Sequence, residues 1–171
     1  ETLLAIINDI LDFSKIEAGR MRLERHGFDL GQVVEETVSL FAKPAQANGV
    51  ELLCRIDLGL PRRITGDALR LRQVLTNLVS NAIKYSPRAG TIRIELAQRE
   101  GFAVLDVLDE GAGVDPQERQ RIFDSFYQGR PPTEGKVKGS GLGLAIAREY
   151  ALAHGGRIEV NGEPVRIHNS R

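Results

Sequence analysis

The chain has few of the residues that form disulfides or bind zinc in small domains. It has no tryptophan and a single cysteine, Cys54, so an intramolecular disulfide cannot form and no cysteine–histidine spacing typical of zinc sites occurs. The neighbours of Cys54 (Leu52, Leu53 and Ile56) are typical of a strand interior, so we expect a buried core thiol. A lone thiol without a bridge indicates a reducing, cytoplasmic compartment.

The chain also lacks an excess of charge and a long apolar run. Lysine plus arginine and aspartate plus glutamate number 23 each, which argues against a nucleic-acid partner but allows a local cationic pocket. No run approaches the roughly 18 apolar residues of a membrane span, so no membrane segment is expected. Glu1 opens directly into a helical pattern, which indicates a fragment and leaves inner-membrane anchoring of the parent protein open.

What is present is a mixture of helical and strand patterns in 171 residues, enough for one domain with an appended element. Asp29 and Asp67 are expected to cap helices. The order predicts an α+β fold, with one mixed sheet and helices on one face, and not a doubly wound fold. Helices are predicted over residues 2–24, 29–48, 67 to a turn at 86–90, 116–122 and 141–154, and strands over residues 50–57, near 64, 91–98, 102–108 and 157–160.

The first predicted helix carries one wide apolar stripe, which a lone surface helix would leave exposed. The stripe indicates a helical bundle or a dimer, with a core helix of the same domain as the alternative. Its residues are Leu3, Leu4, Ile6, Ile7, Ile10, Leu11 and Phe13.

Asn77, Asn81 and Lys84 share one face of the third predicted long helix, because they lie four and three residues apart. Amide oxygens are hard ligands that suit Mg²⁺, and an ammonium group suits phosphate. The alternative is an ordinary polar helix face.

A second cluster, Asp109-Glu110-Gly111-Ala112-Gly113, follows a predicted strand. Its alternating glycines allow the backbone to approach a flat ligand closely, and Asp109 could accept a hydrogen bond from the exocyclic amine of adenine. The alternative is a simple tight turn.

A third cluster runs from Lys138 through Gly139, Gly141 and Gly143 to Leu144 at the start of a predicted helix. Glycine-rich turns at helix N-termini bind phosphate through backbone N–H groups and the helix dipole. The spacing matches neither a P-loop nor a dinucleotide-binding fingerprint, so the fold family is not given by this cluster alone.

The three clusters occur in order, with Phe123 and Phe126 between the second and third, and this arrangement resembles the catalytic domain of sensor histidine kinases. Asn77–Tyr85 is similar to the N box, Asp109–Gly113 to the first glycine box and Gly139–Gly143 to the second, with the two phenylalanines as the F box. Leu11–Gly19 resembles the end of the preceding dimerisation helix, especially in hybrid sensor kinases. The resemblance covers about residues 2–160.

The resemblance implies a Bergerat-type (GHKL) sandwich over residues 26–171, preceded by part of the dimerisation domain, a bundle-forming helix, over residues 1–25. It implies that Mg²⁺ is bound by Asn81, with Asn77 facing the same site, and that residues 124–140 form a lid over ATP. Arg130, Lys136 and Lys138 are either lid contacts to the γ-phosphate or solvated charges. The implied nucleotide-binding residues are Asn81, Lys84 and Tyr85 on the helix, Asp109, Gly111 and Gly113 around the base, and Lys138, Gly139, Gly141, Leu142 and Gly143 at the phosphates.

The implied reaction is transfer of the γ-phosphoryl group of Mg-ATP to a histidine. His26, His154 and His168 all lack the acceptor's sequence context, so we expect no self-phosphorylation of this chain. The implied partners are the chain's own dimerisation helices in a homodimer and the receiver domain of a response regulator. The tail lacks the family's Gly-Thr-aromatic strand after Val160, which puts the last strand in doubt.

Two alternatives remain. A kinase-like regulatory module would bind ATP or a partner kinase without phosphotransfer. An ATPase of the wider superfamily, such as a chaperone or repair enzyme, would hydrolyse ATP without a histidine acceptor; the Leu11–Gly19 helix and the F box argue against it.

Overall fold

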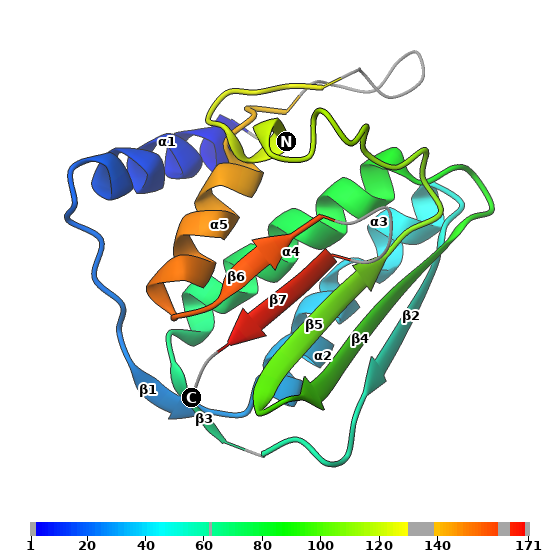
Figure 1. The fold of residues 1–171 in the computed structure, drawn as a ribbon. Helices are drawn as coiled ribbons and strands as arrows, with labels where there is room; N and C mark the ends of the chain where they lie inside the picture. The colour runs from blue at the N-terminus through cyan, green and yellow to red at the C-terminus, as the bar shows by residue number, and fades with distance from the viewer. Residues whose placement is uncertain (1–2, 62, 130–138, 161–164, 170–171) are drawn as a thin grey trace.

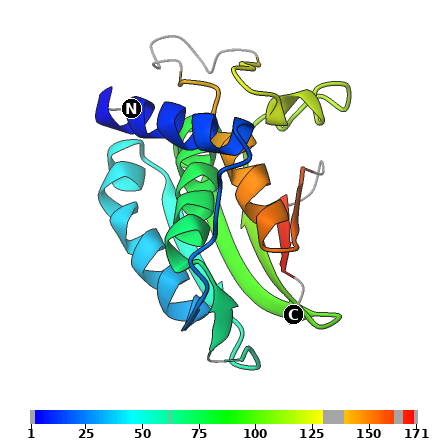
Figure 2. The same ribbon diagram turned by 90° about the vertical axis from the view of Figure 1, so that its left-hand side faces the viewer.

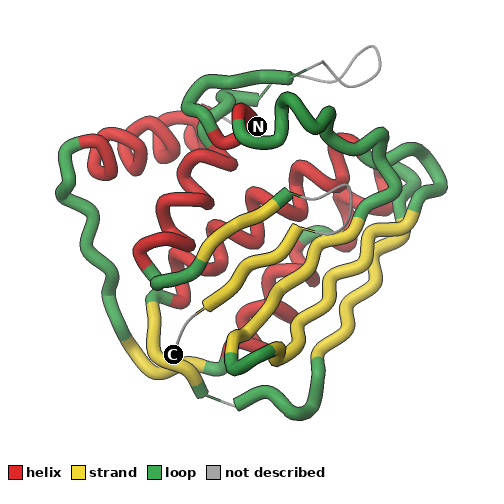
Figure 3. The backbone as a smooth tube through the Cα atoms, in the orientation of Figure 1, coloured by secondary structure: helices red, strands yellow, loops and turns green. Residues whose placement is uncertain are grey.

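The computed structural model describes residues 3–61, 63–129, 139–160 and 165–169. A twisted five-stranded sheet carries its main helices on one face (Figures 1 and 2), and Figure 3 separates the two layers by colour. The helices are α1 (Leu3–Glu17), α2 (Leu30–Leu40), α3 (Ala42–Ala47), α4 (Ala68–Tyr85), the 3-10 turn η1 (Arg121–Phe123) and α5 (Gly143–Ala153). The strands are β1 (His26–Phe28), β2 (Glu51–Ile56), β3 (Ile64–Gly66), β4 (Thr91–Arg99), β5 (Phe102–Leu108), β6 (Arg157–Glu159) and β7 (Val165–Asn169).

The main sheet has the order β2-β4-β5-β7-β6 and is mixed, as predicted, because β2 runs parallel to β4 while the other neighbours are antiparallel. The β4–β5 hairpin turns at Glu100 and Gly101, both with positive φ (51° and 84°), as a two-residue turn matching the twist of the strands requires. The last strand, which the sequence put in doubt, is present as β7 and pairs with both β5 and β6. A separate small ladder joins β1 to β3.

The core lies between the sheet and α4, the longest helix. Asp67 caps α4, because its side chain accepts a hydrogen bond from the backbone N–H of Arg70. One side of α4 buries apolar side chains against Ile92, Ile94 and Leu96 of β4, which are at most 2% exposed. The polar side of α4, opposite the buried one, therefore has a fixed orientation relative to the sheet.

Helix α1 is shorter than the predicted span of residues 2–24. It ends at Glu17, and the next residues leave as an extended linker toward β1. The N–H groups of Gly19 and Arg20 donate to the carbonyls of Ile16 and Lys15, and Gly19 has φ 62°. This is a Schellman cap, which closes a helix at a left-handed glycine.

The predicted helix over residues 29–48 is divided into α2 and α3 at Phe41. Proline has no N–H, so Pro44 cannot donate to the carbonyl of Leu40, four residues earlier. The helical hydrogen-bond ladder is interrupted there.

Two further expectations were wrong. Cys54 is exposed, because β2 is an edge strand and its side of the sheet is incompletely covered. Residues 116–120 form turns, and only Arg121–Phe123 is helical. Ile122 and Phe123 are the only partly buried apolar side chains over residues 116–123, too few to stabilise a longer helix by packing.

Candidate nucleotide-binding site

The polar face of α4 carries the amide and lysine side chains that the sequence grouped together. Asn77, Asn81 and Lys84 are each partly buried, and the side chain of Tyr85 is 46% exposed. The Lys84 ammonium lies 5.4 Å from the centre of the Tyr85 ring. Burial raises the pKa of the Tyr85 hydroxyl above its ordinary value of 10.0.

The second glycine cluster meets α4 at Asn77. The Nδ2 atom of Asn77 donates a 2.8 Å hydrogen bond to the carbonyl oxygen of Gly143, the first residue of α5. A Cβ atom at Gly143 would lie 3.4 Å from the Asn77 amide carbon, at the near limit of ordinary van der Waals contact. Asn77 thus fixes the start of α5 against α4.

The first glycine cluster meets α4 at its C-terminal end, at Tyr85. A Cβ atom at Gly111 would lie 2.9 Å from the backbone oxygen of Tyr85 and 2.6 Å from Oδ1 of Asp109. The N–H of Gly111 donates to that same Asp109 oxygen at 2.7 Å. Only glycine fits this contact without displacing the backbone, and it leaves Asp109 exposed at the end of β5.

Gly141 carries the strongest backbone constraint of the second glycine cluster. It has φ 75°, and a Cβ atom there would lie 2.8 Å from the carbonyl carbon of Phe126. The N–H of Phe126 donates to the carbonyl of Gly141 at 3.0 Å. Leu142, the next residue, is fully buried and anchors the turn in the core.

The two glycine clusters therefore contact α4 at the Asn77 side chain and at the Tyr85 backbone, with Asn81 between these positions in the sequence. Eight residues of α-helix span about 12 Å. Gly111 of the first glycine cluster and Gly143 of the second thus lie against α4 at positions about that far apart, although they come from separate stretches of the chain.

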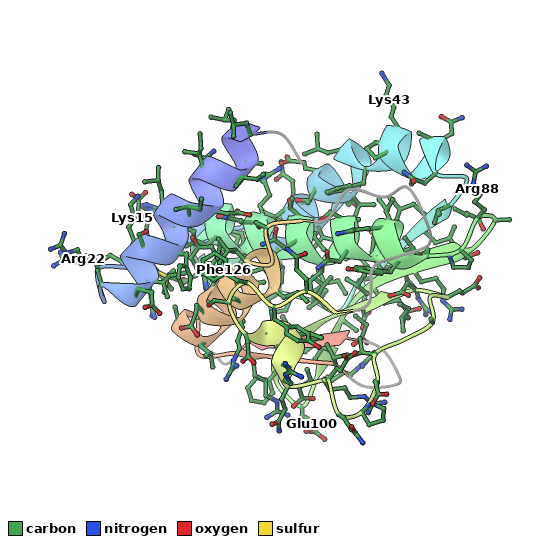
Figure 4. All side chains as sticks on the ribbon, turned by 90° about the horizontal axis from the view of Figure 1, so that it is seen from above. Lys15, Arg22, Lys43, Arg88, Glu100 and Phe126 are labelled. Atoms are coloured by element: carbon green, nitrogen blue, oxygen red, sulfur yellow. The ribbon has the colours of Figure 1, made fainter. Side chains whose placement is uncertain are left out.

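The F-box phenylalanines lie at the base of the predicted lid. Phe126, which is labelled in Figure 4, is 61% exposed. Its ring packs edge-to-face on the ring of Phe13 of α1, with ring centres 5.7 Å apart. Phe123 is partly buried in η1, which contacts α5. The link from Phe126 to α1 was not anticipated, because an exposed phenylalanine carries no sequence signal for its partner.

The basic lid residues Arg130, Lys136 and Lys138 lie outside the described residues. Gly139, the first described residue after them, accepts a 2.6 Å hydrogen bond from the Gln128 side chain through its carbonyl oxygen. A cavity of about 240 Å³ lies elsewhere, beside α1, so it does not belong to the candidate site. Its lining residues are Asp12, Lys15, Arg20, Met21, Arg22, Arg70 and Tyr150.

His154 has a structural role. The Nε2 atom of His154 accepts the backbone N–H of Asp67 at 3.0 Å, and Nδ1 lies 2.7 Å from the carbonyl oxygen of Tyr150. With one ring nitrogen accepting and the other donating, His154 joins the end of α5 to the start of α4.

The comparison with known families decides the assignment. The family described as histidine kinase-, DNA gyrase B-, and HSP90-like ATPase matches residues 66–169, from the end of β3 to the end of β7. The chain belongs to this family. The predicted Bergerat-type α+β fold is thereby confirmed, and the chain is an ATP-binding domain of this ATPase family.

Individual relatives are sensor histidine kinases, which confirms the resemblance read from the sequence. The sensor protein GacS of Pseudomonas syringae pv. syringae is 41% identical over 169 residues, which cover 96% of this chain and 18% of GacS. The crystal structure of full-length ShkA in complex with AMPPNP has a TM-score of 0.83 and 30% identity, over 99% of this chain and 36% of ShkA. The histidine kinase ThkA in complex with the response regulator TrrA has a TM-score of 0.72 and 25% identity, over 98% of this chain and 46% of that one.

The chain thus spans only 18% of the length of GacS, and most of such a relative lies outside it. Within the described residues, no helix is both long enough and apolar enough to cross a membrane.

Proposed function

We propose that the chain is the catalytic part of a sensor histidine kinase, transferring the γ-phosphoryl group of Mg-ATP to a histidine outside this chain. The observation that carries the proposal is the contact of both glycine clusters with α4, at the Tyr85 backbone and at the Asn77 side chain. The ATPase family and the AMPPNP complex of ShkA support it.

The donor set fits a magnesium ion that is shared with the nucleotide. Among the described residues, no group of three histidine, cysteine, aspartate or glutamate side chains could hold a metal ion by itself. Mg²⁺ is usually bound through one or two protein oxygens together with substrate phosphates, and the Asn81 amide oxygen would supply such a ligand. By the family resemblance Asn77 would face the same site, and its side-chain amide donates a hydrogen bond to the carbonyl of Gly143.

Asp109 would select the adenine base. One of its carboxylate oxygens accepts the N–H of Gly111, which fixes the orientation of the exposed carboxylate. The second oxygen would accept the exocyclic amine of adenine. Gly113, with φ 71° and no atom within 4 Å of an added Cβ, would leave room for the base, and Tyr85 would pack beside the nucleotide.

The phosphates would be held by Lys84 from α4 and by the second glycine cluster at the start of α5. Backbone N–H groups at a helix start attract anions, and Gly139, Gly141, Leu142 and Gly143, which lie at the start of α5, would offer such groups to the phosphates. We include Lys138 in this contact on the family resemblance.

These residues position ATP and neutralise charge, which is most of what phosphoryl transfer requires from a protein. Mg²⁺, when bound, would neutralise negative charge on the phosphate oxygens. The acceptor is a neutral imidazole, already a nucleophile, so no elaborate general base is needed. His154 does not serve as acceptor, because both of its ring nitrogens are engaged.

We further propose that residues 1–25 belong to the dimerisation domain and residues 26–171 to the catalytic domain, in a homodimer that acts in the cytoplasm. Residues on one side of α1 remain exposed and apolar, which supports a helical partner. They are Leu3, Leu4, Ile7, Ile10 and Leu11, between 44% and 74% exposed. The ThkA–TrrA complex supports the receiver domain of a response regulator as a second partner.

The test is phosphorylation of an acceptor supplied in trans. The chain is mixed with ATP, Mg²⁺ and a separate histidine-bearing dimerisation domain, and acid-labile phosphate on the acceptor is measured. We expect labelling by the native chain, a loss of at least about tenfold with Asn81→Ala, and no change with Gln98→Ala, an exposed amide on β4. Bound ATP without any labelling would favour the regulatory module instead.

A further inference from the structure

A polar cluster connects α1 to the rest of the chain, here called the ATP-binding body (α2 to α5 with the sheets). The Nη1 atom of Arg70, in the first turn of α4, lies 3.2 Å from both carboxylate oxygens of Asp12 on α1. The two side chains are only 21% and 13% exposed. An ion pair this shielded is screened less by salt than a surface pair.

Two more side chains of the ATP-binding body, those of Gln73 and Tyr150, complete the cluster. The Nε2 atom of Gln73 donates to Asp12 at 2.9 Å, and its oxygen accepts from Arg70 at 3.2 Å. The hydroxyl of Tyr150 accepts from Arg70 at 2.8 Å, and the Arg70 guanidinium carbon lies 4.9 Å from the centre of the Tyr150 ring. Among the residues that the structure describes, Asp12 is the hydrogen-bonding contribution of α1 to this cluster, which α4 and α5 otherwise build.

The residues of the ATP-binding body that form this cluster are held in place by contacts that do not involve α1. Asp67 accepts the backbone N–H of Arg70 through one carboxylate oxygen and the N–H of Glu24 through the other. The N–H of Asp67 donates to His154, the C-cap residue of α5. The start of α4, the end of α5 and the linker after α1 are thus joined at the point from which Arg70 projects.

The apolar contacts of α1 with the body are too few to define its rotation. None of the described α1 residues is fully buried; Phe13 and Ile16 pack partly against the core. A rotation by one residue turns a helix by about 100°, and apolar residues also lie on its exposed side. A buried polar pair is a known way to specify one register among several apolar ones.

We propose that Arg70, Gln73 and Tyr150 form a docking site for Asp12, and that these positioning residues set the orientation of the dimerisation helix on the ATP-binding body. The docking is inferred from the contacts of Asp12 alone. Its consequence, the placement of the acceptor histidine relative to ATP, rests on the proposed function.

The experiment measures the distance between α1 and the body in the 171-residue chain. One spin label is attached to Cys54, the single cysteine, which is exposed on β2, and the other to Asn8→Cys on exposed α1. Double electron–electron resonance is recorded after dilution with unlabelled chain, which removes distances between molecules. We expect one narrow distance distribution for the labelled parent.

Asp12→Ala is expected to broaden this distribution at least twofold, and Asp12→Glu, which keeps the carboxylate, to restore most of the narrow component. Glu17→Ala is the matched control, an exposed carboxylate on the same helix, and should change nothing. Asp12 lies outside the core, so the body should fold in every variant, which circular dichroism checks. An unchanged distribution in Asp12→Ala would overturn the docking site, as would equal broadening in Glu17→Ala.

Binding of an ATP analogue with Mg²⁺ is titrated on the same samples. We expect Asp12→Ala to bind within about twofold of the parent, because Asp12 is not among the proposed nucleotide contacts. Absence of binding in the parent would defeat the proposed function and leave the distance result standing.

Discussion

Gly111 has no side chain, and this allows the first glycine cluster to pack closely against the end of α4. A methyl group at this position would lie 2.6 Å from Asp109 Oδ1 and 2.9 Å from the Tyr85 backbone oxygen. We predict that Gly111→Ala destabilises the fold by about 1–3 kcal/mol through this overpacking and lowers affinity for an ATP analogue about tenfold or more. Chemical denaturation and calorimetric titration measure the two effects.

The matched control for this prediction is Gly59→Ala. The nearest atom to an added Cβ at Gly59 is a side-chain oxygen of Asp57 at 3.5 Å, an ordinary contact. This variant should keep native stability and affinity. If Gly111→Ala behaves in the same way, the close seating of the first glycine cluster on α4 is not what orders the site.

Tyr150 gives a prediction in alkaline solution. Burial, and then the charge of Asp12, raise the pKa of its hydroxyl above the ordinary 10.0. The unfolded chain releases this proton near pH 10 while the folded chain retains it, so stability is complete below pH 10 and is lost as the pH rises further. Tyr150→Phe should lower stability at pH 8 by about 1 kcal/mol and weaken the loss between pH 8 and pH 11.

Urea denaturation at the two pH values measures this difference. Some pH dependence should persist, because the pKa values of Tyr85 and Tyr127 are raised as well. An identical loss of stability in the native chain and in Tyr150→Phe would contradict the assignment to Tyr150.

For single residues, the sequence predicts which side chains share a helix face better than it predicts their burial or their contacts with distant residues. Asn77, Asn81 and Lys84 share a face because helical spacing alone dictates it. The exposure of Cys54 could not be predicted in this way, since it depends on β2 being an edge strand. The bond from Asp67 to His154 joins residues 87 positions apart and has no local signal.

The end of α1 is set by a single glycine, which gives a prediction for a whole element. Gly19 has φ 62° and no atom within 4 Å of an added Cβ, so a substitution there changes backbone strain alone. Gly19→Ala should cost about 1–2 kcal/mol at the cap and increase hydrogen exchange in the last turn of α1. Gly19→Asn should cost less, since asparagine tolerates this conformation. Equal exchange in all three chains would show that the cap does not control the helix end.

Element types were predicted more reliably than their boundaries. Asp29 and Asp67 cap α2 and α4 as expected, because a capping carboxylate is a local feature. The signals at Gly19 and Pro44 were present in the sequence and were outweighed by an apolar periodicity that continues past them. Helix periodicity describes a face and does not give the last residue.

At the scale of the whole molecule, the mixed sheet with helices on one face followed from the order of the elements. The strand order and the way α1 lies on the body did not, because both depend on contacts between distant residues. Asp12 and Arg70 are 58 positions apart, and each side chain alone is typical of a solvated helix surface. The convergence of the glycine clusters was inferred from their order and resemblance; the contacts with α4 give it a physical basis.

The central claim is that one Mg-nucleotide occupies the face of α4 between the two glycine clusters. The most direct test is an NMR titration of the uniformly ¹⁵N-labelled chain with a non-hydrolysable ATP analogue and Mg²⁺. We predict that the backbone amides of Gly111, Gly113, Gly141 and Gly143 and the side-chain amide of Asn81 shift together along one binding curve, while Gly59 stays in place. Shifts confined to one glycine cluster, or to residues of the cavity beside α1, would contradict the account.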